Sequence, residues 1–309
     1  MPRALTLFIL SAILAPAWGQ AARCRALLSQ PHNVALAQIN TRIGDFAANT
    51  AHILRFIEKA GEAGADTVVF PELTVSGYPP RDLLDRPEFA ARSLDAVEAI
   101  AAAARGLGSR APRTIILGAA LQNPKPDGRP NINAAVVIHD GYVVHTQAKR
   151  LLPSYDVFDE DRYFEAGTES RTWDSGRGQV GCAICEDSWG LQPHEGRLRY
   201  HGVDPARDLV DSDFVVNLSA SPFESGKNQV RGEVFSGFAQ RAEAPVVFVN
   251  QVGAHDDILF DGRSRIYGSD GRVLLTLPAF EEALVVARLS AHAMGETAEV
   301  LGQWQPSGA

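Results

Sequence analysis

The sequence is short of cysteine, of basic charge and of long apolar runs, and each shortage excludes a class of protein. Only 3 cysteines occur in 309 residues, which is too few for a disulfide scaffold, so each is considered as a thiol. Lysine and arginine number 29 against 37 acidic residues, and the formal net charge is −8. Because there is no basic surplus to neutralise phosphates, we expect no nucleic-acid partner.

Histidine is also scarce, and its spacing indicates no metal. The 8 histidines include no pair at a metal-ligand spacing such as H-E-x-x-H. The sequence therefore predicts no metal site. The apolar and charged fractions, 45% and 21%, are those of a globular protein and exclude a disordered chain.

One apolar run stands at the start of the chain. Residues 1–20 read MPRALTLFILSAILAPAWGQ, with Arg3 before the run and the small residues Ala17 and Gly19 near its end. This pattern matches a secretory signal better than a membrane span, which needs roughly 20 apolar residues. The alternative is an upstream start codon that adds residues absent from the working protein. Under either interpretation, residues 1–32 are predicted to be a leader outside the folded domain.

Strand-like and helix-like segments alternate from residue 33 onward. Apolar or β-branched runs predict strands at 33–38, 66–70, 113–118, 134–138, 142–146, 179–184, 213–218 and 246–249. Helical spacing predicts helices at 51–63 (with Thr50 as N-cap), 93–105 and 230–243. Asp-Gly dipeptides predict hairpin turns at 139–141 and 269–271. No linker divides the chain, so we expect one α/β domain over residues 33–290, with the tail, 291–309, outside its core.

Three polar residues follow predicted strands, where open α/β sheets place reactive groups. They are Glu72 after DTVVFP, Lys149 after the first hairpin, and Cys185 at the end of QVGCAIC. Together they form a coherent set for acyl transfer. A thiol is the nucleophile, a carboxylate takes its proton, and an ammonium stabilises the oxyanion. The backbone N–H of Glu186 is a candidate second donor to that oxyanion.

Each of these residues also has a structural interpretation. Taken alone, Cys185 is more typical of a buried cysteine at the end of a core strand. Taken alone, Glu72 is more typical of a solvated loop carboxylate, and Lys149 of a surface pair with Arg150. Cys182 and Cys185 have the spacing of a redox pair, but they lie within one strand, where alternation directs residues three apart to opposite faces.

Longer motifs around the three residues distinguish between these interpretations. Glu72 lies in VVFPELTVSGYPPRDLL, and Lys149 lies near the start of AKRLLPSYDVFDEDRYFEAG. Cys185 lies in VGCAICEDSWG, and two further motifs come later, NLSASPFESGK and VNQVG. Together they resemble the nitrilase, or carbon–nitrogen hydrolase, superfamily. Within it the chain is most similar to the glutaminase part of glutamine-dependent NAD synthetase. The resemblance covers about residues 33–290.

The resemblance implies a fold and a set of site residues. The fold is a four-layer α-β-β-α sandwich with two mixed β-sheets, and members of the family commonly pair into homo-oligomers. Carried over by position, Cys185 is the nucleophile, Glu72 the general base and Lys149 the oxyanion-stabilising cation. Glu160, in VFDEDRYF, matches a second glutamate beside this triad. The residues expected at the substrate pocket are Tyr155, Glu186 and Ser219.

The implied reaction is hydrolysis of the glutamine side-chain amide to glutamate and ammonia through a cysteine thioester. It needs no cofactor and no metal, because the lysine supplies the positive charge. The Ser-Gly-Gly-x-Asp-Ser loop of an ATP-using synthetase does not occur in the sequence, so a separate ATP-dependent NAD synthetase is the expected acceptor of the ammonia. Two alternatives are an amidase acting on another small amide, nitrile or carbamoyl compound, and a non-catalytic subunit of a synthetase.

The resemblance also bears on location and on one loop. NAD synthesis favours a cytoplasmic protein, whereas a genuine signal at residues 1–19 predicts a secreted or periplasmic one. Gly253 to Asp257 departs from the family pattern, which is richer there in glutamine, asparagine and glutamate. We therefore expect this segment to alter the details of the pocket or of its loop packing, and not the triad.

Overall fold

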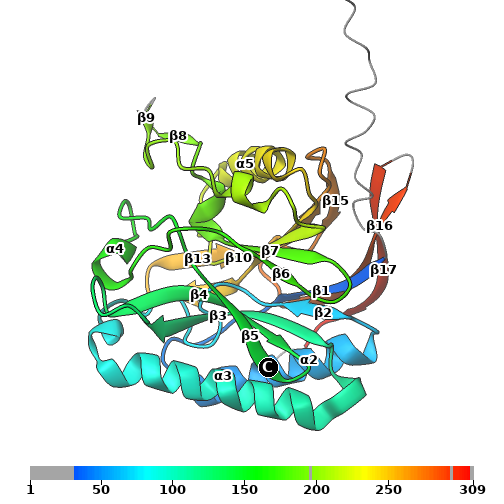
Figure 1. The fold of residues 1–309 in the computed structure, drawn as a ribbon, viewed down its shortest axis with the longest axis horizontal. Coiled ribbons are helices and arrows are strands. Elements are labelled where there is room, and N and C mark those ends of the chain that lie inside the picture. Colours follow the sequence, from blue (N-terminus) through cyan, green and yellow to red (C-terminus); the bar gives the residue numbers. More distant parts are fainter. Residues whose placement is uncertain (1–30, 195–196, 293–294, 307–309) are drawn as a thin grey trace, which may run out of the picture.

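The polypeptide folds into four layers, with helices outside two facing β-sheets (Figure 1). A computed structural model describes residues 31–194, 197–292 and 295–306. The predicted α-β-β-α sandwich is confirmed. The predictions for residues 1–30 lie outside the described residues. Within the described ranges, no helix combines the length and the apolarity that crossing a bilayer requires.

The first sheet has seven strands in the order β17-β16-β1-β2-β3-β4-β5. The strands are β1 (His32–Gln38), β2 (Thr67–Val69), β3 (Thr114–Gln122), β4 (Asn131–His139), β5 (Tyr142–Ala148), β16 (Ala283–His292) and β17 (Gly295–Trp304). β1, β2 and β3 run parallel, and the remaining neighbours are antiparallel. The sheet is therefore mixed, as predicted.

The second sheet has six strands in the order β15-β14-β11-β10-β7-β6. They are β6 (Thr172–Asp174), β7 (Gln179–Ile184), β10 (Phe214–Ser219), β11 (Val246–Asn250), β14 (Arg265–Tyr267) and β15 (Val273–Thr276). β7, β10 and β11 are parallel, so their carboxyl ends meet at one edge. Two small hairpins complete the strands: β8 (Pro193–His194) with β9 (Arg197–Leu198), and β12 (Val252–His255) with β13 (Ile258–Asp261).

Period-two alternation within the strands divides the core into layers. In β1, Ala35 and Ala37 pack towards helices α2 (Phe46–Glu62) and α3 (Pro87–Leu107), whereas Val34 and Leu36 face the second sheet. On the far side, α5 (Lys227–Ala242) covers the second sheet through residues such as Phe235 and Phe238. The remaining helical segments are short: α4 (Glu160–Tyr163), η1 (Arg81–Asp85), η2 (Gly108–Arg110), η3 (Cys185–Ser188) and η4 (Pro205–Leu209).

The start of α2 differs from the prediction. The helix begins at Phe46, and Asp45, not Thr50, is its N-cap, since the Asp45 side chain accepts the N–H of Ala48 at 3.1 Å. Phe46 and Asn49 belong to the buried face of this earlier turn. Asp and Thr both serve as N-caps, so residue type alone does not distinguish Asp45 from Thr50. The helix starts at the earlier position because Phe46 and Asn49, which precede the apolar run, are buried.

The tail was also predicted wrongly. Residues 295–304 form β17, which pairs with β16, and the ring of Trp304 packs edge-to-face on Phe56 with centroids 5.0 Å apart. The boundary expected at residue 290 falls within β16. β17 is an edge strand with a largely exposed face, so its sequence, GETAEVLGQW, lacks the apolar alternation that would mark a buried strand.

Candidate active site

Cys185 is the first residue of η3 and directly follows the last residue of β7, so the chain turns sharply at this position. Its φ angle is 42°, in the left-handed region that non-glycine residues rarely adopt. The turn is fixed by Asp187, whose carboxylate accepts the backbone N–H groups of Ile184 at 2.9 Å and of Arg150 and Leu151 at 3.0 Å each. Burial raises the pKa of Asp187 to about 6. These bonds tie the cysteine turn to the segment that follows Lys149.

Glu72 lies in the turn after β2 and is fully buried. The turn packs directly on Gly118 of β3: the Gly118 N–H donates to the Pro71 carbonyl at 3.2 Å, and the Val75 N–H donates to the Gly118 carbonyl at 3.1 Å. A Cβ at position 118 would lie 2.7 Å from the Glu72 Cα. Only glycine allows the backbone of β3 to approach this closely.

The ammonium of Lys149 lies between two carboxylates. Its Nζ donates to Glu72 Oε1 at 2.7 Å and to Glu160 Oε1 and Oε2 at 2.9 and 2.8 Å. All three side chains are buried, with at most 6% of any of them exposed. Glu160 comes from the first turn of α4, so residues from three separate segments converge. The sequence-predicted residues Glu72, Lys149 and Glu160 are thus in direct contact.

The pKa shifts follow from burial and from these charges. Burial alone would lower the pKa of Lys149, but Glu160 and Glu72 outweigh it and hold that pKa well above its usual value. Burial raises the pKa of Glu160 to about 7, against the opposing effect of Lys149. Burial, reinforced by the charge of Glu72, also raises the pKa of Cys185 well above that of a free thiol. In the resting site, therefore, the lysine is charged and the cysteine is a thiol.

Three further groups contact the two carboxylates, and the sequence prediction missed them. The Tyr78 hydroxyl donates to Glu160 Oε1 at 2.8 Å. The Asn133 side-chain amide donates to Glu72 Oε1 at 2.7 Å, and the backbone N–H of Ala220 donates to Glu72 Oε2 at 3.0 Å. Tyr78 lies within the quoted motif around Glu72, but an asparagine inside a strand carries no local signal.

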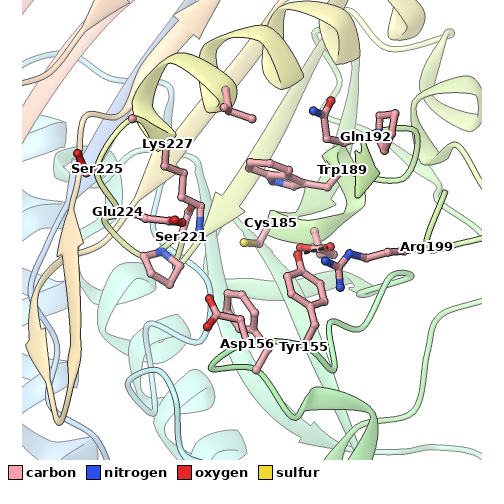
Figure 2. A pocket seen from close by; sticks show the side chains of 16 residues that line it. Tyr155, Asp156, Cys185, Trp189, Gln192, Arg199, Ser221, Glu224, Ser225 and Lys227 are labelled. Carbon is pink, nitrogen blue, oxygen red and sulfur yellow. Dashed lines mark hydrogen bonds between the residues drawn. The ribbon is translucent and has the colours of Figure 1, made fainter. Parts of the chain in front are cut away.

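Cys185 forms part of the wall of a cavity of about 630 Å³. Figure 2 shows its sulfur directed into the space between Trp189, Lys227 and Tyr155. The cavity also contains charges of both signs. The described residues that line it are Tyr155, Asp156, Phe158, Cys185, Glu186, Trp189, Gln192, Pro193, Arg199, Ser221, Pro222, Glu224, Ser225, Gly226, Lys227 and Val230.

Two of the three residues predicted for the substrate pocket, Tyr155 and Glu186, line the cavity. The Glu186 Oε1 accepts the hydroxyls of Tyr155 at 2.8 Å and of Tyr200 at 2.7 Å. Burial raises the pKa of both tyrosines, so their hydroxyls remain donors. The guanidinium of Arg199 lies over the Tyr155 ring, 3.3 Å from its centroid.

Ser219 is not among the lining residues. It is fully buried, and its Oγ donates to Asn217 Oδ1 at 2.7 Å, while Asn217 Nδ2 donates to Ser188 Oγ at 2.9 Å. Through Asn217, Ser219 is therefore linked to Ser188, in the helical turn that begins at Cys185. The serines that line the cavity are Ser221, two residues further along the chain, and Ser225.

Lys227 is the first residue of α5, and its ammonium projects into the cavity. Its Nζ lies 6.0 Å from the centroid of the Trp189 ring. Burial lowers its pKa, while the nearby charge of Glu224 opposes that shift.

The sequence predicts no metal site. Among the described residues, the structure contains no group of three or more His, Cys, Asp or Glu side chains that could hold a metal ion.

Residues 33–299 match the family model for carbon–nitrogen hydrolases. A glutamine-dependent NAD(+) synthetase of Synechocystis sp. is 37% identical over 260 residues, which cover 82% of this chain and 45% of the relative. The corresponding protein of Thermotoga maritima is 34% identical over 259 residues, covering 83% of this chain and 42% of the relative. The chain thus spans less than half the length of these curated relatives.

Solved structures share the fold of this chain. The glutamine-dependent NAD+ synthetase of Acinetobacter baumannii superimposes with a TM-score of 0.75 at 31% identity, covering 91% of this chain and 49% of that one. An amidase from Nesterenkonia sp. shares the fold, with a TM-score of 0.68 at 21% identity over 84% of this chain and 90% of that one. The chain belongs to the carbon–nitrogen hydrolase family and is an enzyme of the hydrolase class.

Proposed function

We propose that this protein hydrolyses the side-chain amide of glutamine through a thioester on Cys185. The observation that carries the proposal is the buried Glu72–Lys149–Glu160 cluster, whose charges act on the pKa of a thiol that opens into a cavity. The kinship with glutamine-dependent NAD synthetases supports glutamine as the substrate.

Acylation follows from the protonation states of the resting site. Glu72 removes the thiol proton as Sγ attacks the amide carbon. The oxyanion that forms is stabilised by the Lys149 ammonium and by the backbone N–H of Glu186. Glu72 then transfers its proton to the amide nitrogen, the carbon–nitrogen bond breaks, and ammonia leaves. The product on the enzyme is a γ-glutamyl thioester.

Deacylation uses the same groups in reverse. Glu72 takes a proton from water as the water oxygen attacks the thioester carbon, and Lys149 again stabilises the oxyanion. The carbon–sulfur bond breaks, the proton returns to Sγ, and glutamate leaves. Glu160 holds Lys149 in place through two hydrogen bonds of 2.9 and 2.8 Å.

The charges of the cavity suit a zwitterionic amino acid. Lys227 provides a cation for the α-carboxylate, and Glu186 and Glu224 provide anions for the α-ammonium. Paired charges of this kind would select glutamine over a simple amide, because an uncharged substrate leaves them unmatched. The relatives are more than twice as long as the matched region, so we further propose that an ATP-dependent synthetase consumes the ammonia.

The test is ammonia release from glutamine by the wild type and by Cys185→Ala. Turnover by the wild type that is lost in the variant is the expected result. Asparagine and propionamide serve as comparison substrates, and a better rate with either would refute glutamine. In parallel, a diazoketone analogue of glutamine should alkylate Cys185 once, and mass spectrometry should detect one covalent adduct on the peptide that contains Cys185. Labelling at Cys182, or no labelling at all, would contradict the thioester mechanism.

A further inference from the structure

Asn133 contacts both polar partners of the proposed nucleophile from a single position on β4. Its side-chain Nδ2 donates to Glu72 Oε1 at 2.7 Å, and its backbone carbonyl accepts the N–H of Lys149 at 2.8 Å. Asn133 is fully buried. β4 lies between β3, which supports the Glu72 turn, and β5, which leads into Lys149. One residue thus connects two segments that are 77 positions apart in the sequence.

We propose that Asn133 is a positioning residue for the base: its amide fixes the Glu72 carboxylate in the orientation that receives the thiol proton. This role rests on the proposed function, because it needs Glu72 to act on Cys185. The polarity of the bond follows from the chemistry of the partner. An ionised carboxylate is only an acceptor, so the amide group facing it must be the NH₂ group.

The hydrogen bonds of Glu72 show why a second side-chain donor matters. Oε1 is shared by Lys149 and Asn133, while Oε2 receives the backbone N–H of Ala220. Lys149 must also serve the oxyanion during the proposed reaction, so its hold on Glu72 changes within each cycle. Asn133 is neutral and takes no part in the charge changes. Its bond can therefore persist throughout the cycle and keep the carboxylate in one orientation while the contacts of Lys149 change.

The same strand offers a matched control. Asn131 lies two residues earlier on the same face of β4 and is also buried, but its Nδ2 donates to the Leu84 carbonyl at 3.1 Å, away from the cluster. Asn131→Ala and Asn133→Ala both delete one buried amide of equal size. Only the second removes a bond to Glu72.

The experiment measures two rates as a function of pH in the full chain: glutamine hydrolysis and alkylation of Cys185 by iodoacetamide, followed by peptide mass. For Asn133→Ala we expect kcat/KM to fall by about 10²-fold, and the rate of alkylation to fall with it at every pH, because the Glu72 carboxylate is no longer held in the orientation that receives the thiol proton. Asn131→Ala should lower thermal stability and leave both profiles in place.

Asn133→Asp keeps the size of the side chain and gives a signature that a merely structural role would not. Near neutral pH the introduced carboxylate faces that of Glu72, and activity should be lowest. At acidic pH the introduced carboxyl is protonated and regains an O–H donor, so the activity of this variant relative to wild type should rise as the pH falls.

Wild-type rates of hydrolysis and alkylation in Asn133→Ala, or an equal effect of Asn131→Ala on both rates, would overturn the role of Asn133. A wild type that alkylates normally but does not hydrolyse glutamine would refute the proposed substrate instead. In that case the alkylation profiles still decide the role of Asn133.

Discussion

Lys149 donates to both carboxylate oxygens of Glu160 while it also touches Glu72, and none of the three side chains reaches solvent appreciably. Two carboxylates and one ammonium leave a net negative charge in a low-dielectric interior. Such an arrangement is costly unless every charge remains paired. The cluster is therefore better explained by chemistry than by stability, and it makes the fold sensitive to the loss of the lysine.

Lys149→Met should abolish turnover and destabilise the protein. Removing one partner of a buried ion pair typically costs about 3–5 kcal/mol, because the remaining charge is unpaired. Urea denaturation gives the change in the free energy of unfolding, and ammonia release gives the activity. In the double variant Lys149→Met, Glu160→Gln, one unpaired carboxylate is gone, so part of the stability should return while activity stays absent. A stable, active single variant would contradict the role of the cluster.

The activity should rise with pH through about 7. Burial raises the pKa of Glu160 to about 7. Below that pH its carboxyl is neutral and holds the Lys149 ammonium less firmly, so kcat/KM for glutamine should fall on the acidic side. Glu160→Gln cannot titrate and should remove this limb while lowering the plateau. An acidic limb that persists unchanged in Glu160→Gln would assign it to another group.

Tyr78→Phe also tests the titration of Glu160, because it should raise the pKa of that carboxyl instead of removing the carboxyl. The Tyr78 hydroxyl donates to Glu160 at 2.8 Å, which lowers the pKa of that carboxyl relative to burial alone. Without this donor the pKa of Glu160 rises, and the acidic limb should move up by about one pH unit, the equivalent of one charged hydrogen bond. A limb that moves to lower pH would show that Tyr78 does not donate to the ionised carboxylate.

Gly118 packs directly against the backbone of the Glu72 turn, so a larger residue at this position should displace the turn. In Gly118→Ala the new Cβ would lie 2.7 Å from the Glu72 Cα, against backbone that cannot rotate away. The turn must shift, and activity should fall by about 10²-fold or more even where the protein still folds. Gly106→Ala on α3, where a Cβ meets nothing within 4 Å, is the matched control and should be neutral or slightly stabilising. Equal effects of the two substitutions would exclude the steric explanation.

Sequence reasoning reached the parts of the site that lie at strand ends within long motifs. Glu72, Lys149 and Cys185 occupy such positions, and Glu160 lies in one of the same motifs, at the start of α4. The four layers followed from the same resemblance. The contacts of Asn133 could not be predicted, because they depend on β4 lying between β3 and β5, and lateral strand order leaves no trace in local sequence.

Two errors have related causes. Ser219 was placed at the pocket because its segment matches one that lines the pocket in the family, but its hydroxyl satisfies Asn217 within the core. β17 was missed because an exposed edge strand needs no apolar face, so its pairing with β16 is decided by the backbone. In both cases the deciding interaction was a hydrogen bond to a residue whose position only the folded chain defines.

Lys227→Met should separate substrate recognition from chemistry. The Lys227 ammonium lines the cavity without touching the Glu72–Lys149–Glu160 cluster through any hydrogen bond described, and it stands over Trp189. If it binds the α-carboxylate, its loss should raise KM for glutamine by about 10–100-fold, as expected for a charged hydrogen bond of roughly 1.5–3 kcal/mol, and change kcat only a few-fold. Propionamide has no carboxylate, so its kcat/KM should be unchanged. Steady-state ammonia assays with both amides make the comparison, and an equal loss for the two substrates would show that Lys227 supports the cavity and does not recognise the amino acid.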